Sequence, residues 1–214
     1  MFNSLRQGSI CAVEAKLSEI FEFIVSSKKM PYEYTSYILI QLLCSTLKYV
    51  YEIGADVEEI FRTTNVFGDI LQMDTMKKKY QWFREVYARI LEYMTEKREN
   101  AKNDIVCAVL EYIRQNYTQE LSLAVLSEKF YLSGPYLSKI FKEVTGESIK
   151  RYINNYRIEK AKEFLRNSNY NIETISRKVG YDNVRSFMKT FRNYVGMSPG
   201  DYRKMLVVSN ENGS

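Results

Sequence analysis

Residues 126–146 read LSEKFYLSGPYLSKIFKEVTG, and residues 175–196 read ISRKVGYDNVRSFMKTFRNYVG, so the chain carries one motif twice. Equivalent residues lie 50 positions apart late in the motif and 49 apart early in it, as the pairs Phe141/Phe191, Gly146/Gly196 and Leu126/Ile175 show. The one-residue slip falls beside Gly180, where a turn is expected. A short helix, a tight turn and a basic second helix, all repeated, predict a tandem helix-turn-helix and indicate DNA as the partner.

Helical spacing and capping residues support this interpretation. In the first copy the apolar residues follow i, i+3, i+4 and i+7 spacing, namely Leu137, Ile140, Phe141 and Val144. Ser133 is expected to cap the second helix of that copy, and either Asp182 or Asn183 its equivalent. Gly146 and Gly196 stand where a helix end favours a left-handed residue. Both copies therefore predict a basic helix bounded at each end.

The segment between the copies predicts a single connecting helix. It contains no Gly or Pro from Ser148 to Leu165, and its apolar stripe consists of Ile149, Tyr152, Ile153, Tyr156, Ala161, Phe164 and Leu165. At roughly 1.5 Å per residue this helix is about 27 Å long. Such a helix can hold two recognition helices about one DNA turn apart, roughly 34 Å. The expected fold is all-α, with two three-helix units joined by a long helix.

Residues 104–205 resemble the DNA-binding domain of AraC/XylS-type transcription regulators. The resemblance rests on residues 132–146, 157–165 and 179–203. Ser127 and Ser176 replace the alanine that is usual in the family's support helices, a mild departure. The resemblance implies a sequence-specific transcription regulator in the cytoplasm that reads two adjacent major-groove segments of double-stranded DNA, with RNA polymerase as a further partner.

The resemblance also assigns roles to the exposed side chains of the two recognition helices. Residues at base-facing positions are Pro135, Ser138, Lys139, Val184, Arg185, Met188 and Lys189. Residues at phosphate-facing positions are Ser133, Lys142, Asn183 and Arg192. Arg and Lys favour guanine, and Val or Met can meet a thymine methyl. Arg157, Tyr202 and Arg203 are assigned to structure and backbone contacts.

Three segments are expected: a helical linker region over 1–103, the DNA-binding domain over 104–206, and a disordered tail over 207–214. The first region resembles the helical segment that precedes the DNA-binding domain in large Firmicute AraC-type regulators, where a receiver or a membrane sensor lies upstream. The chain is therefore expected to be the output part of a signal-responsive regulator or a stand-alone short relative. In the first of these two cases, an upstream sensor or receiver would be missing from this chain.

Apolar residues in the first region form a seam with alternating steps of four and three: Met76, Tyr80, Phe83, Tyr87, Ile90 and Met94. This is the spacing of a coiled coil. Two interpretations remain open. The seam either packs within its own domain, or it forms a homodimer through residues 76–94.

Charge and composition narrow the function. Residues 104–214 hold 17 Lys and Arg against 12 Asp and Glu, whereas residues 1–103 hold 14 of each, so the net charge of +5 lies in the half with the repeats. Phosphate neutralisation by such residues dominates DNA affinity. There is no histidine, and Cys11, Cys44 and Cys107 are scattered. These features predict no metal, no cofactor and no enzyme, including a thiol alkyl transferase. A partner that pairs with a regulator without binding DNA is the alternative.

Overall fold

The computed structural model describes residues 2–6, 8–27 and 31–211, and every regular element in these ranges is an α-helix. The all-α expectation is confirmed. The chain divides into two compact units, residues 1–100 and residues 101–214. The described residues of the N-terminal unit form one apolar core, and those of the C-terminal unit form two.

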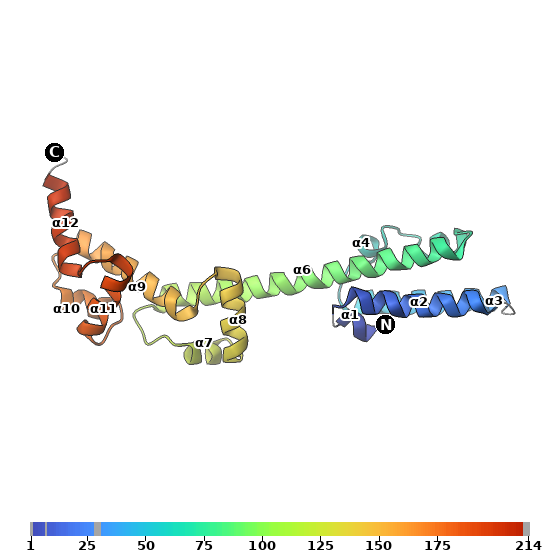
Figure 1. Ribbon diagram of the computed structural model, residues 1–214, viewed down its shortest axis with the longest axis horizontal. Coiled ribbons are helices and arrows are strands. Elements are labelled where there is room, and N and C mark those ends of the chain that lie inside the picture. The colour runs from blue at the N-terminus through green and yellow to red at the C-terminus, as the bar shows by residue number, and fades with distance from the viewer. Residues whose placement is uncertain (1, 7, 28–30, 212–214) are drawn as a thin grey trace. The chain divides into compact units, whose positions relative to one another are not determined.

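The N-terminal unit packs helices around one apolar core (Figure 1). Its elements are α1 (Phe2–Arg6), α2 (Ile10–Ser26), α3 (Tyr32–Glu52), α4 (Val57–Phe61), α5 (Val66–Gln72) and the first part of α6 (Met76–Asn116). The Ser9 hydroxyl starts α2 by accepting a hydrogen bond from the Ala12 amide at 3.3 Å. Steps of four and three then bury one face of α2, formed by Val13, Leu17, Phe21 and Ile24.

The seam between residues 76 and 94 packs inside this unit. Phe83, Tyr87 and Ile90 are at most 1% exposed and belong to the core shared with α2 and α3. The Tyr87 hydroxyl lies 2.8 Å from the Thr46 hydroxyl, and burial raises the pKa of Tyr87 to about 12 although this hydrogen bond acts in the opposite direction. Of the two interpretations left open, the structure supports packing of the seam within its own domain, because these residues fill the core of the N-terminal unit.

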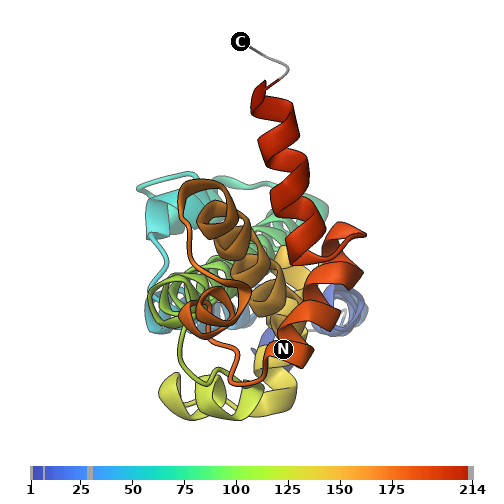
Figure 2. The same cartoon turned by 90° about the vertical axis from the view of Figure 1, so that its left-hand side faces the viewer.

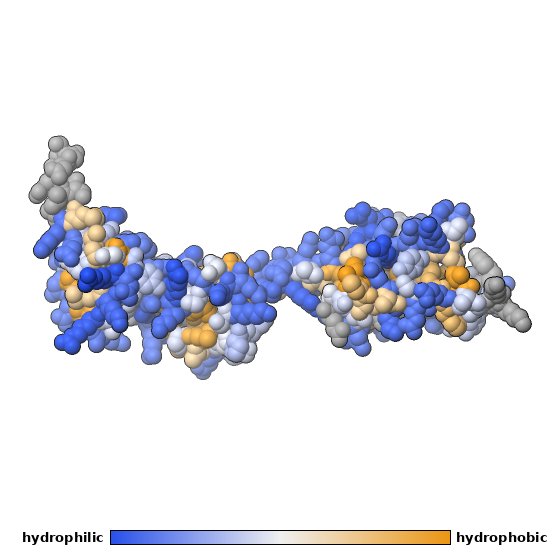
Figure 3. All heavy atoms as spheres, in the orientation of Figure 1, coloured by the Kyte–Doolittle hydropathy of each residue, from blue (hydrophilic) through white to orange (hydrophobic). Residues whose placement is uncertain are grey.

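Helix α6 runs for 41 residues and contributes to both units. It contains no Gly or Pro, so nothing in its sequence interrupts the backbone hydrogen bonds. Residues 95–101 are exposed, and the surface over the middle of the helix is hydrophilic (Figure 3). The domain boundary expected after residue 103 lies within this helix, because a charged sequence without helix breakers continues the helix instead of ending it.

The C-terminal unit contains the end of α6 and six further helices (Figure 1). These are α7 (Leu123–Lys129), α8 (Gly134–Thr145), α9 (Ile149–Asn167), α10 (Ile172–Lys178), α11 (Val184–Val195) and α12 (Pro199–Glu211). Helix α12 projects from its unit in both views (Figure 2). It extends to residue 211, because Asp201–Glu211 lacks Gly and Pro, so the backbone over 207–211 is helical where a disordered tail was expected. The remainder of that expectation, residues 212–214, lies outside the described residues.

Helix α9 is buried in two separate cores. Ile149 and Ile153 pack with α6, α7 and α8, whereas Ile158, Ala161 and Leu165 pack with α10 and α11. The predicted connecting helix is confirmed, and its apolar stripe serves first one motif and then the other. The sequence stripe omitted Ile158, which is 1% exposed. One continuous helix therefore contributes side chains to the cores of both motifs.

Replacing Ile90 by Asp should unfold the N-terminal unit. The change buries an unpaired carboxylate where no partner is available, at a cost of more than about 4 kcal/mol. Gln81→Asp, at an exposed position on the same helix, is the control. Urea denaturation followed by circular dichroism checks this expectation. An Ile90→Asp chain as stable as the control, changed only in its sedimentation, would contradict the intramolecular packing.

Replacing Leu165 by Ala should destabilise the second motif by about 2–5 kcal/mol, because the cavity lies in a closed core. Leu165 is 3% exposed, and its neighbour Arg166 is exposed on the same helix. Arg166→Ala should change the free energy of unfolding by less than about 0.5 kcal/mol. Chemical denaturation of both variants measures the difference, and equal effects would mean that α9 is not anchored through Leu165.

Candidate nucleic-acid interface

The two helix-turn-helix motifs, α7–α8 and α10–α11, share one turn geometry. In the first turn the Leu132 amide donates to the Ser127 carbonyl at 2.9 Å, and in the second the Tyr181 amide donates to the Ser176 carbonyl at 3.0 Å. The residue before each donor has a positive φ, +55° at Tyr131 and +85° at Gly180. All three pairs are 49 positions apart, so the repeat seen in the sequence is also a repeat of backbone structure.

The one-residue slip between the copies is Asp182. Ser133 occupies the N-cap of α8 and Asn183 the N-cap of α11, and these two residues are 50 positions apart. Of the two predicted caps of α11, the structure selects Asn183, whose side-chain oxygen accepts from the Arg185 amide at 2.8 Å. Ser133 makes no side-chain cap hydrogen bond. Its hydroxyl is not used to begin the helix.

Helix α8 presents the predicted contact residues on the face opposite its core. Leu137, Ile140 and Phe141 are buried. The outward residues are all exposed, namely Pro135, Ser138, Lys139 and Lys142. Glu143 lies 3.8 Å from the Lys139 ammonium and 3.4 Å from the Lys102 ammonium. An exposed pair of this kind contributes little to stability, so Lys139 remains available to another anion. Val144, expected on the apolar face, is 39% exposed near the helix end.

Helix α11 has the same division between a buried and an outward face. Phe187 and Phe191 are buried in the second core. The outward face carries four exposed residues, Arg185, Met188, Lys189 and Arg192, beside the half-buried Val184. The structure therefore brings the predicted base-facing residues of each motif onto one surface of its second helix. Glycines in the left-handed conformation end both helices, with φ of +78° at Gly146 and +86° at Gly196.

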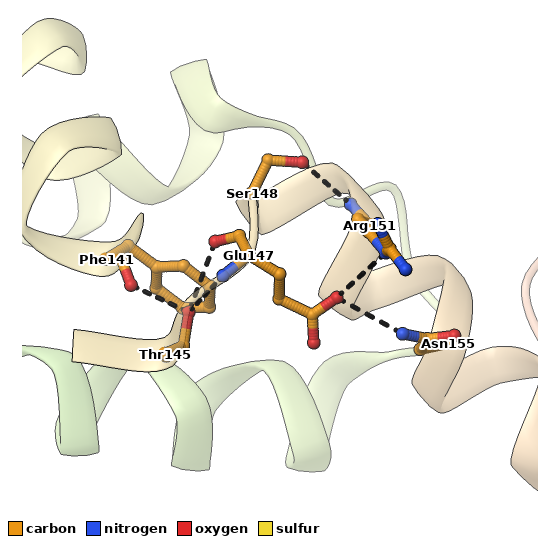
Figure 4. Close-up of polar contacts among 6 residues, drawn as sticks. All are labelled: Phe141, Thr145, Glu147, Ser148, Arg151 and Asn155. Carbon is orange, nitrogen blue, oxygen red and sulfur yellow. Dashed lines mark hydrogen bonds and ion pairs between the residues drawn. The ribbon is translucent and has the colours of Figure 1, made fainter. Parts of the chain in front are cut away.

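A cluster of polar contacts lies where α8 ends and α9 begins (Figure 4). The Thr145 hydroxyl donates to the Phe141 carbonyl at 2.7 Å, and the Ser148 hydroxyl caps α9 by accepting from the Arg151 amide at 3.3 Å. The Glu147 carboxylate lies 3.5 Å from Arg151 Nε and accepts from Asn155 Nδ2 at 3.2 Å. The sequence reasoning missed this cluster, although Glu147 and Arg151 stand at the i, i+4 spacing of a helix-surface pair.

Other kinds of site are not seen in the part of the chain that the structure describes. No group of three or more His, Cys, Asp or Glu side chains there could hold a metal ion. In the same residues, no helix combines the length and the apolar character needed to cross a membrane.

Comparison with known proteins gives matches along most of the chain. A family model described as a helix-turn-helix domain matches residues 126–205. The Msm operon regulatory protein of Streptococcus mutans is 35% identical over 116 residues, which are 54% of this chain and 41% of that protein. YtdP of Bacillus subtilis, an uncharacterized HTH-type transcriptional regulator, is 24% identical over 209 residues, which are 95% of this chain and 26% of YtdP. The chain therefore spans less than half the length of either relative.

Among solved structures, the C-terminal domain of AraT, a response regulator from Geobacillus stearothermophilus, is 33% identical. The match covers 47% of this chain and 84% of that domain, with a TM-score of 0.47. The duplicated motif lies within residues 126–205, which the family model matches. Residues 126–205 therefore form a helix-turn-helix domain of the AraC type.

Proposed function

We propose that residues 101–214 bind double-stranded DNA sequence-specifically by placing α8 and α11 in two adjacent segments of the major groove. The observation that carries this proposal is the pair of exposed, basic helix faces at equivalent positions of two motifs that share α9. A recognition helix in such a motif enters the major groove with its N-terminal residues toward the bases. The excess of positive charge in this half of the chain favours the approach of a polyanion.

Base contacts come from the N-terminal halves of the two helices, within their first two turns. On α8 these are Pro135, Ser138 and Lys139, and on α11 they are Val184, Arg185, Met188 and Lys189. A long Arg or Lys side chain can donate to guanine O6 and N7, while an apolar side chain such as Met188 can contact a thymine methyl. Helix α11 can distinguish more kinds of base pair than α8, because it combines two cations with two apolar groups.

Phosphate contacts come from residues that flank these faces, namely Ser133, Lys142, Asn183 and Arg192. Such contacts position a protein on DNA without reading its sequence. The Ser133 hydroxyl is not engaged in capping, so it can donate to a phosphate oxygen. The Asn183 oxygen already accepts from the first amides of α11, which leaves the amide NH₂ as the donor.

The N-terminal unit is the part through which a signal would reach the DNA-binding unit. Its residues carry no net charge up to position 103, which favours protein contacts over DNA. It has its own closed core, so it can act as a separate body. Together with the larger size of its relatives, this supports the chain as the output part of a signal-responsive regulator, with RNA polymerase as a further partner.

Selection of bound duplexes from a random pool tests the proposal. The full chain should enrich a two-segment site whose halves lie about one DNA turn apart, roughly 10.5 base pairs from centre to centre. A chain that binds no duplex, or binds all sequences equally, would favour a partner that pairs with another regulator instead.

Replacing Arg185 by Ala should weaken binding to the selected site by about 1–3 kcal/mol and relax the preference at one base pair. The physical reason is the loss of two hydrogen bonds to one base edge. Binding measured on duplexes that carry each of the four base pairs at every position checks this expectation. Unchanged preference at all positions would remove Arg185 from the base-reading residues.

Replacing Lys142 by Ala should weaken all duplexes alike and lower the slope of log affinity against log salt by about one. The change removes one cation that displaces a counterion from a phosphate. Lys48→Ala removes the same charge from an exposed position of the N-terminal unit and is the matched control. Titrations at several salt concentrations measure the slope. A change in base preference with Lys142→Ala would contradict its assignment to phosphate.

A further inference from the structure

The two motifs differ in length at two places, a loop of the first motif and the turn of the second, and these two places are in contact. The loop between α6 and α7 has six residues, 117–122, whereas its equivalent between α9 and α10 has four, 168–171. The second turn contains the extra residue Asp182, beside Gly180 and Tyr181. The longer loop of the first motif packs against this turn of the second motif.

Arg157 on α9 holds the longer loop. Its Nε donates to the Tyr117 carbonyl at 2.8 Å, and its Nη2 donates to the Gln119 carbonyl at 2.6 Å. A planar guanidinium can bond two backbone carbonyls at once, whereas a lysine ammonium cannot match this geometry. The Tyr117 ring also packs on Tyr156 of α9, with centroids 5.3 Å apart, and lies against the core of the second motif.

The same guanidinium contacts the second turn. Its carbon lies 5.3 Å from the centre of the Tyr181 ring, and the Tyr181 hydroxyl donates to Asn154 Oδ1 at 3.2 Å. Burial lowers the pKa of Arg157, while Tyr181 and Asp182 act in the opposite direction. Arg157 therefore links a loop of the first motif to the turn of the second by contacts on two sides.

Gly180 lies where the backbones of the two motifs come closest in this contact. A Cβ at this position would lie 2.7 Å from the Tyr117 carbonyl oxygen and 2.9 Å from the Thr118 Cα and carbonyl oxygen. These are backbone atoms, so they cannot move aside as a flexible side chain would. The backbones of the two motifs approach so closely that only glycine fits between them.

We propose that this joint, formed by Tyr117, Gln119, Asn154, Arg157, Gly180 and Tyr181, fixes the orientation of α8 relative to α11 and thereby sets the spacing between the two DNA segments that the chain accepts. The consequence for DNA rests on the proposed function, whereas the consequence for orientation does not. If helix α9 alone connected the two motifs, no second contact would prevent one motif from tilting relative to the other. The joint adds a second connection beside α9, and two connections resist bending that one permits.

The first experiment measures orientation without DNA. Spin labels are attached through Lys139→Cys on α8 and Lys189→Cys on α11, after Cys11, Cys44 and Cys107 are replaced by Ser. Pulsed dipolar spectroscopy on the full chain should give a narrow distance distribution. Arg157→Met should broaden it, Arg157→Lys should broaden it partly, and Arg166→Met, which removes the same charge from the same helix, should leave it unchanged.

The second experiment uses the unlabelled chain and duplexes in which base pairs are added or removed between the two selected segments. About five added base pairs rotate the second segment to the opposite face of the duplex. The wild-type chain should lose affinity sharply with each change of spacing. Arg157→Met should bind the natural spacing about tenfold more weakly, because a loose joint lowers the effective concentration of the second motif, and it should discriminate less between spacings.

The outcomes separate the two proposals. A distance distribution that stays narrow in Arg157→Met, or an unchanged spacing profile, overturns the joint. If the distance distributions come out as expected but the unlabelled wild-type chain binds no duplex, the joint is supported and the proposed function is rejected. If Arg157→Met does not fold, Asn154→Ala removes only the acceptor of the Tyr181 hydroxyl. That variant should still broaden the distribution, and its failure to do so would count against the joint.

Discussion

The fold of the C-terminal unit depends on the division of α9 between two cores. A helix of this length cannot bury its whole apolar stripe in one small motif. Without α9, each motif would also lack one helix of its core. Ile149 and Ile153 are buried in the core of the first motif. The core of the second motif contains Ile158, Ala161 and Leu165. Each motif alone would expose the face that α9 covers, and small cores of this kind have little stability to spare. The positions of α8 and α11 therefore depend on α9, because each of them packs against it.

Much of this unit follows from the sequence, because duplication supplies an internal comparison. The pairs of glycines that end α8 and α11, the apolar spacing of both helices and the uninterrupted connecting helix each have a local physical cause. The outward faces follow in turn, since a residue that does not point into the core of a short helix is exposed. The roles of Arg185 or Lys142 toward DNA rest on the resemblance and stay predictions.

Other features could not be read from local patterns. The seam over 76–94 has the same spacing in a coiled coil as in a helix buried within its own unit, and only the position of α2 and α3 decides between them. The continuation of α6 through the expected domain boundary follows from the lack of a helix breaker, whereas the boundary was expected where the family resemblance begins. The contacts of Arg157 depend on loop 117–122 reaching the second motif. No periodic pattern records such a long-range approach.

Tyr131 and Gly180 show how two copies of one motif can differ in mutational tolerance. Both residues adopt a positive φ at the same point of the turn, but Tyr131 is 95% exposed whereas a side chain at Gly180 would meet backbone atoms of residues 117 and 118. A bulky residue with positive φ carries local strain, which the first copy sustains because its side chain meets nothing. The second copy has no such freedom. Sequence drift can therefore proceed at position 131 through any residue that accepts this backbone conformation, while position 180 is closed to all of them for as long as the two motifs remain in contact.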